Sequence, residues 1–158
     1  MLRQVDFSTH YTHWDVLLAS PVNPMPEATR QSWLTRILLA LRNIEAGDKP
    51  GAEDWRILSD AVNLAETMIV HGIVADEDGI KQRGLNAMAD AGARYLQGQP
   101  MRLSGDGIQA MRSLVEDIGD LMAILPHRDF VKVHRATEKR ISEMLRGKRQ
   151  AGDVVVAV

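Results

Sequence analysis

Two histidines and a carboxylate near the N-terminus are the first residues whose types and spacing suggest chemistry. His10, His13 and Asp15 lie in the segment STHYTHWD. In a helix the two imidazoles, three residues apart, face the same way and can share a metal ion. Asp15 falls on another face of such a helix, and a closed zinc site requires four ligands. We therefore regard His10 and His13 as minor metal candidates and expect no metal cofactor.

The remaining histidines do not complete a recognised catalytic or metal-binding motif. The sequence contains no HExxH, no ExxH pair of the di-iron type, no GxSxG and no phosphate-binding loop. It has no cysteine, which excludes disulfides, thiol catalysis and cysteine-ligated zinc. A metal-dependent helical-bundle enzyme that uses His10, His13 or His71 with an acid such as Glu66 is the last of three hypotheses.

An acidic run, DEDG at residues 76–79, resembles part of a calcium loop. An EF-hand loop places acidic ligands at positions one, three and five and a glycine at position six, whereas Gly79 is fourth in this run. Acidic residues at the start of a helix are explained by the positive end of the helix dipole. The run therefore predicts a helix that begins near Asp76, and no cation site.

Glycine and proline divide the chain into five segments in which apolar residues recur three or four positions apart, as in amphipathic helices. The first segment follows Pro26, and the last follows Pro126. Gly47 and Gly72 have the positions expected of helix ends, and Ser104 or Asp106 can cap the fourth helix. Short connections favour antiparallel neighbours. The sequence predicts an all-α protein, an antiparallel up-and-down bundle of about five helices.

The predicted bundle occupies residues 27–147, between an extended N-terminal arm and a short tail. The arm, residues 1–26, has a possible short helix at 9–19. An amphipathic helix there would have an apolar face made of four residues, Tyr11, Trp14, Leu17 and Leu18. The tail, residues 148–158, is first basic and then apolar, and we expect three of its residues to dock on a protein surface: Val154, Val155 and Val156.

The sequence indicates the compartment of the protein only through the signals that it lacks. The first residues lack the apolar centre of a secretory signal, and no apolar run approaches the ~18 residues that span a membrane. We therefore expect a cytoplasmic protein that does not contact a membrane. The formal net charge of −2 is too small to identify a partner.

The last predicted helix is strongly basic. Residues 128–149 contain eight lysine or arginine residues and three acids, a net charge of +5, so the rest of the chain carries −7. Five of the basic residues are spaced by four, three, four and seven positions and would form one helical face, which we name the basic stripe: Arg128, Lys132, Arg135, Lys139 and Arg146. A solvated helix face, a protein-binding surface and a nucleic-acid-binding surface all have this pattern.

The sequence thus leaves several functions open. We favour a non-enzymatic protein that acts through protein–protein contacts, as a homodimer or with another protein, such as a small regulatory or inhibitory factor of a bacterium, phage or plasmid. The alternative is a nucleic-acid-associated regulator that uses the same basic stripe. The acidic remainder of the chain and the absence of aromatic residues at exposed positions of this helix count against the alternative.

Overall fold

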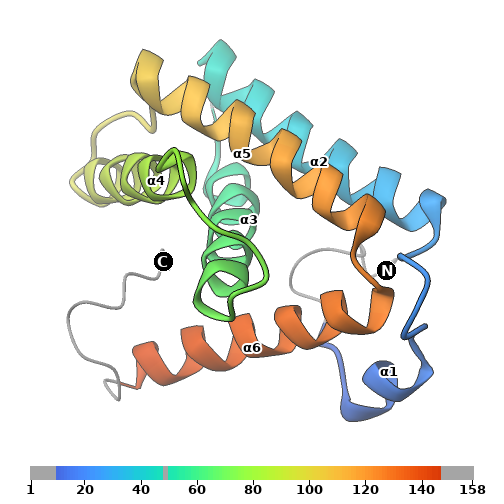
Figure 1. The fold of residues 1–158 in the computed structure, drawn as a ribbon. Coiled ribbons are helices and arrows are strands. Elements are labelled where there is room, and N and C mark those ends of the chain that lie inside the picture. The colour runs from blue at the N-terminus through green and yellow to red at the C-terminus, as the bar shows by residue number, and fades with distance from the viewer. Residues whose placement is uncertain (1–9, 48–49, 147–158) are drawn as a thin grey trace, which may run out of the picture.

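The computed structural model describes residues 10–47 and 50–146, which form six α-helices and contain no β-strand. The helices, shown in Figure 1, are α1 (His13–Leu18), α2 (Glu27–Ala46), α3 (Ala52–Val70), α4 (Ile80–Leu96), α5 (Gly105–Ile124) and α6 (His127–Leu145). The all-α class predicted from the sequence is confirmed, and α1 lies within the short helix expected at residues 9–19. Within the described ranges, no helix combines the length and apolarity needed to cross a membrane.

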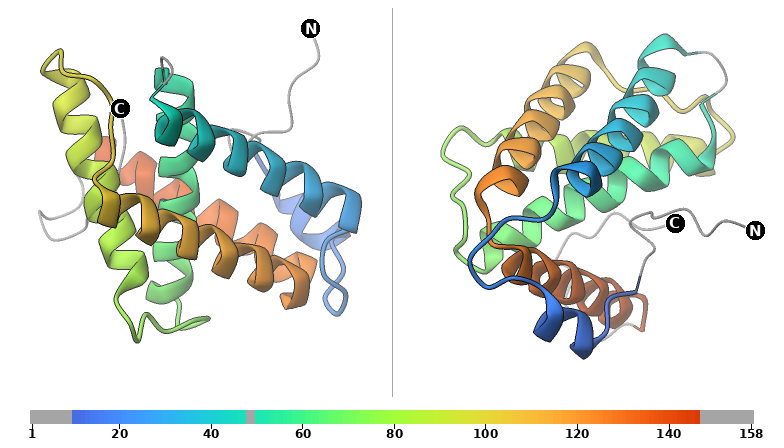
Figure 2. Two further views of the ribbon diagram at one scale, coloured as in Figure 1. Left: turned by 90° about the horizontal axis from the view of Figure 1, so that it is seen from above. Right: turned by 90° about the vertical axis from the view of Figure 1, so that its right-hand side faces the viewer.

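Helices α2 to α5 make up the main core. Helices α2 and α5 run antiparallel and side by side in every view (Figures 1 and 2). Helix α3 crosses this pair, and α4 packs against both α3 and α5. Because α3 is surrounded by α2, α4, α5 and α6, its residues Leu58, Ala61 and Ala65 have no solvent exposure.

Helix α6 forms a further layer on the core. It lies across the C-terminal part of α3, and α1 packs alongside it (Figure 1). Phe130 and Val133 of α6 join the main apolar core, which removes their surface from water. The arm that carries α1 is thereby brought against a helix more than 100 positions later in the sequence.

The helices begin and end near the glycine, proline and capping residues that predicted their ends, with one correction. Gly47 ends α2 in the left-handed conformation, and the Ser104 hydroxyl caps α5 by accepting the N–H of Gly107 at 3.0 Å. The helix predicted to begin near Asp76 begins at Ile80, because Gly79 is left-handed with φ 67°.

The Asp76 carboxylate nevertheless caps α4 from outside the helix. It accepts the backbone N–H groups of Lys81 and Gln82, each at 3.0 Å. These amides have no partner within the helix, so the acceptor stabilises the first turn. The carboxylate that the sequence suggested for a helix start does have this role, although the helix begins four residues after it, at Ile80.

Candidate functional site

The two N-terminal histidines make different contacts. His10 lies before α1, and its Nδ1 is 3.0 Å from a carboxylate oxygen of Glu138 on α6. His13 is the first residue of α1 and is exposed. The Asp15 carboxylate accepts hydrogen bonds from the backbone N–H and the hydroxyl of Thr12, which together cap α1. Among the residues that the structure describes, no three His, Cys, Asp or Glu side chains group around a possible metal position.

The acid and histidine named for the enzyme hypothesis do not meet either. His71 is exposed at the C-terminal end of α3. A carboxylate oxygen of Glu66 instead lies 3.2 Å from a guanidinium nitrogen of Arg140 on α6.

A buried polar network joins α3 to α6 around this ion pair. Arg140, which is 4% exposed, also donates to the hydroxyl of Thr67 at 3.0 Å. The hydroxyl of Thr137 donates to the same Thr67 oxygen at 2.7 Å. Buried polar groups are tolerated where they are hydrogen-bonded, so this network fixes α6 in one position on α3. The sequence named Glu66 only as an acid of the enzyme hypothesis and did not predict its ion pair with Arg140.

A second histidine of α6, His134, is part of the core. Its ring packs edge-on against Tyr11 at 4.8 Å and against Trp33 at 5.7 Å between ring centres. Burial raises the pKa of Tyr11 and that of Glu138, whose carboxylate lies 3.9 Å from Nδ1 of His134. These contacts tie the arm to α6 from inside the protein.

Arg128 holds α1 in place. Its guanidinium donates to the carbonyl oxygens of Val16 and Leu17 at 3.0 Å and of Ala19 at 3.2 Å. These are the carbonyl groups at the end of a helix that lack an internal partner, and a cation there also complements the helix dipole. The spacing of the sequence placed Arg128 on the stripe, whereas the structure shows it as a positioning residue for α1.

The start of α6 is capped by the same arm. Pro126 offers no side-chain acceptor at the N-terminus of α6. The carbonyl of Ser20 accepts the N–H of Arg128 at 2.9 Å, and the carbonyl of Asn23 accepts the N–H of His127 at 2.8 Å. Helix α6 and the arm therefore satisfy each other's unpaired backbone groups.

Four other members of the basic stripe remain at the surface of α6. Lys132, Arg135, Lys139 and Arg146 are exposed, and the ammonium of Lys139 lies 3.9 Å from Glu143. Val154, Val155 and Val156, also predicted to contact a partner, lie outside the described residues.

Of the four residues expected on the apolar face of the short N-terminal helix, Tyr11 packs against α6, whereas Trp14, Leu17 and Leu18 are exposed. Val16 and Ala19 are buried against Val131 of α6 in a small apolar cluster. The large apolar side chains of α1 and of the turn after it face outward: Trp14 is 70% exposed, Leu17 48%, Leu18 82% and Val22 76%. The spacing of Val16 and Ala19, three residues apart, was the signal that could have identified the buried side.

The helix that carries Trp14, Leu17 and Leu18 packs against α6, and two basic residues of α6, Lys132 and Arg135, are exposed. Lys132 follows Val131, which contacts α1, and Arg135 is close enough to Asp15 to affect its titration. Hydrogen bonds from Thr12 lower the pKa of the Asp15 carboxyl, and the positive charge of Arg135 lowers it further. We name this surface the α1–α6 face and define it by six residues: Trp14, Leu17, Leu18, Val22, Lys132 and Arg135.

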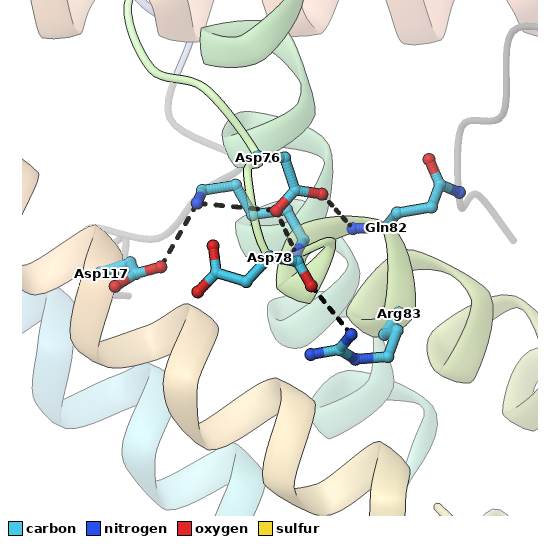
Figure 3. A network of polar contacts seen from close by, with 6 residues as sticks. Asp76, Asp78, Gln82, Arg83 and Asp117 are labelled. Atoms are coloured by element: carbon cyan, nitrogen blue, oxygen red, sulfur yellow. Dashed lines mark hydrogen bonds and ion pairs between the residues drawn. The ribbon is translucent and has the colours of Figure 1, made fainter.

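A second surface, which is acidic, lies at the loop between α3 and α4. Lys81 is only 7% exposed, and its ammonium lies 3.3 Å from Asp117 and 3.9 Å from Asp76 (Figure 3). Beside it is a surface hollow of ≈ 410 Å³, which we name the acidic hollow. It is lined by Val74, Ala75, Glu77, Asp78, Lys81, Asp117, Asp120, Leu121 and Ile124.

Comparison of the chain with protein-family models, with curated proteins and with solved structures found no match. The function is therefore argued from the two surfaces themselves.

Proposed function

We propose that the protein acts without catalysis, by binding an acidic surface of a partner protein through the α1–α6 face. The observation that carries this proposal is the outward direction of four large apolar side chains within nine residues of the arm. Scattered exposed apolar residues are ordinary, but a group of them bordered by charges is typical of an interaction surface.

The anchoring of α1 makes this face suitable for binding. Helix α1 has only six residues, and isolated helices of that length are unstable in water. Here Arg128, the Val131 cluster and the capping of α1 by Thr12 hold it in its helical conformation. A surface that is already ordered loses less conformational entropy on binding, so more of the contact energy appears as affinity. Trp14 is of the residue type most often found at binding hot spots.

The charge of the face indicates the chemistry of the partner. Lys132 and Arg135 are exposed on α6, the helix against which α1 packs, and positive charge there attracts an acidic surface during encounter. A contact in which this face met its own copy across a two-fold axis would place like charges opposite one another, which is unfavourable. The partner surface is therefore apolar in its centre and acidic at its margin.

One observation also supports nucleic-acid binding. The structure brings the exposed ring of Trp14 to α6, and the described part of α6 has no exposed aromatic residue of its own. The bases of single-stranded nucleic acids stack on such a ring. The three aliphatic side chains around it offer no hydrogen bond to a phosphate or a base. The rest of the chain outside residues 128–149 carries −7, which repels a polyanion.

Photo-crosslinking tests the proposal and separates the two partner classes. A photoreactive residue at position 18 should give a protein adduct in cells that contain the native partner, and Lys132→Glu with Arg135→Glu should reduce its yield by at least tenfold. The matched control carries the same group at position 39, an exposed leucine of α2, and should give little adduct. An adduct removed by nuclease, or equal yields at both positions, would contradict the proposal.

A further inference from the structure

We infer that the partner surface recognised by the α1–α6 face is the acidic hollow of a second copy of this chain. The inference rests on the proposed function and names its partner. It requires that the hollow carry uncompensated negative charge and that it offer apolar surface of its own.

The hollow carries more negative charge than its single lysine can offset. Lys81 is engaged by Asp76 and Asp117. Glu77 and Asp120 are exposed, and neither takes part in an ion pair within the described parts of the chain. A bound cationic side chain would therefore gain attraction to carboxylates that the fold itself does not use.

Asp78 adds to this charge. Figure 3 shows its carboxylate beside the lysine network, with no dashed contact to it, while its backbone carbonyl accepts a hydrogen bond from Arg83 at 2.9 Å. The backbone contact positions the loop, and the carboxylate remains available to an incoming guanidinium or ammonium group.

The hollow also has an apolar part. Val74 and Leu121 line it, and Ile124 at the end of α5 is 73% exposed. Two more large apolar side chains are exposed shortly before Val74 in the chain: Val70, the last residue of α3, at 60% and Ile73 at 37%. Burial of such surface against Trp14 and Leu18 removes apolar area from water, which favours association.

The two surfaces are thus complementary to each other and not to themselves. Each has an exposed apolar group, and their charges are of opposite sign. A contact between two different surfaces can add further copies or close into a ring, depending on its geometry. The weight-average mass is expected to rise above that of one chain with concentration, and to fall again as salt screens the charges.

Charge reversal provides the test. One variant, Lys132→Glu with Arg135→Glu, lacks the basic half of the contact. The other, Glu77→Lys with Asp120→Lys, lacks the acidic half. In sedimentation velocity each variant alone should remain at the mass of one chain. An equimolar mixture should associate, because the unchanged hollow of the first variant can bind the unchanged α1–α6 face of the second.

Matched controls separate the contact from general charge effects. Asp90→Lys on α4 and Arg42→Glu on α2 change the charge by the same amount per residue at exposed positions outside both surfaces, and should associate like the unmodified chain. Circular dichroism checks that every variant is folded.

Three outcomes would overturn the inference: an unmodified chain at single-chain mass throughout, variants that associate alone, or a mixture that does not associate. The proposed function fails separately. If position 18 crosslinks to a different protein while sedimentation shows one chain, then the proposed function stands and the inference about a second copy is wrong. If position 18 gives no protein adduct whose yield falls with Lys132→Glu and Arg135→Glu, both are wrong.

Discussion

Two regions of the molecule are stabilised by different kinds of contact. One is the core of α2 to α5, and the other is the layer formed by α6 and α1. The core is one large cluster of buried apolar side chains around α3. The layer adds Phe130 and Val133 to that cluster, but much of its remaining attachment is polar: the Arg140 network to α3 and the Arg128 contacts to α1. Apolar burial is non-directional and contributes most of the stability, whereas buried hydrogen bonds specify orientation. The difference suggests that the core maintains the fold and that the layer presents α1 at a fixed angle.

The largest effect is expected in the core. Leu58→Ala removes three carbon atoms of a side chain with no solvent exposure in the most surrounded helix, and should lower the free energy of unfolding by about 2–5 kcal/mol. Leu39→Ala, at a position that is 52% exposed on α2, should cost less than about 0.5 kcal/mol. Urea denaturation measures both. Equal costs would show that α3 is not the centre of the apolar core.

A smaller loss is expected where the layer meets the core. Arg140→Met leaves the hydroxyl of Thr67 and the carboxylate of Glu66 without this partner, and should cost about 1–3 kcal/mol in the same measurement. Arg146→Met, at an exposed position of the same helix, is the control and should be nearly neutral. Adding Glu66→Gln should cost less in the Arg140→Met background than alone, because the two side chains interact. Strict additivity would argue against the network.

The smallest change in the free energy of unfolding is expected at α1, where hydrogen exchange should nevertheless change strongly. Arg128→Met removes three contacts to the end of this helix, so the amide of Ala19 should exchange with solvent at least about tenfold faster. Amides of α3 should be unaffected, since the main core does not depend on α1. Lys132→Met controls for the loss of a positive charge on α6. Unchanged exchange at Ala19 would mean that the apolar cluster alone holds the helix.

The α1–α6 face shows how far periodicity could predict this site. It predicted a short amphipathic helix and a basic helix, and both are present. It assigned Tyr11, Trp14, Leu17 and Leu18 to one apolar face without determining whether that face is buried, and the structure packs only Tyr11 of the four against α6. A six-residue helix packs only one narrow side, and the smaller residues Val16 and Ala19 fit closer to Val131.

The sequence by itself determined the local events. Proline, glycine and capping side chains act within a few residues, so Pro26, Gly47 and Ser104 mark helix ends wherever the chain folds. The alternation of apolar residues likewise required helices with a buried side, because only burial offsets the cost of ordering them.

Only the tertiary structure decided which charged residues face water. Arg128, Arg140 and Lys81 are indistinguishable in sequence from exposed basic residues, yet each is held by groups from another helix, 36 to 112 positions away. The reason is physical: a charge leaves water only where distant carbonyl or carboxylate oxygens replace its hydration, and the folding of the whole chain brings those oxygens to it.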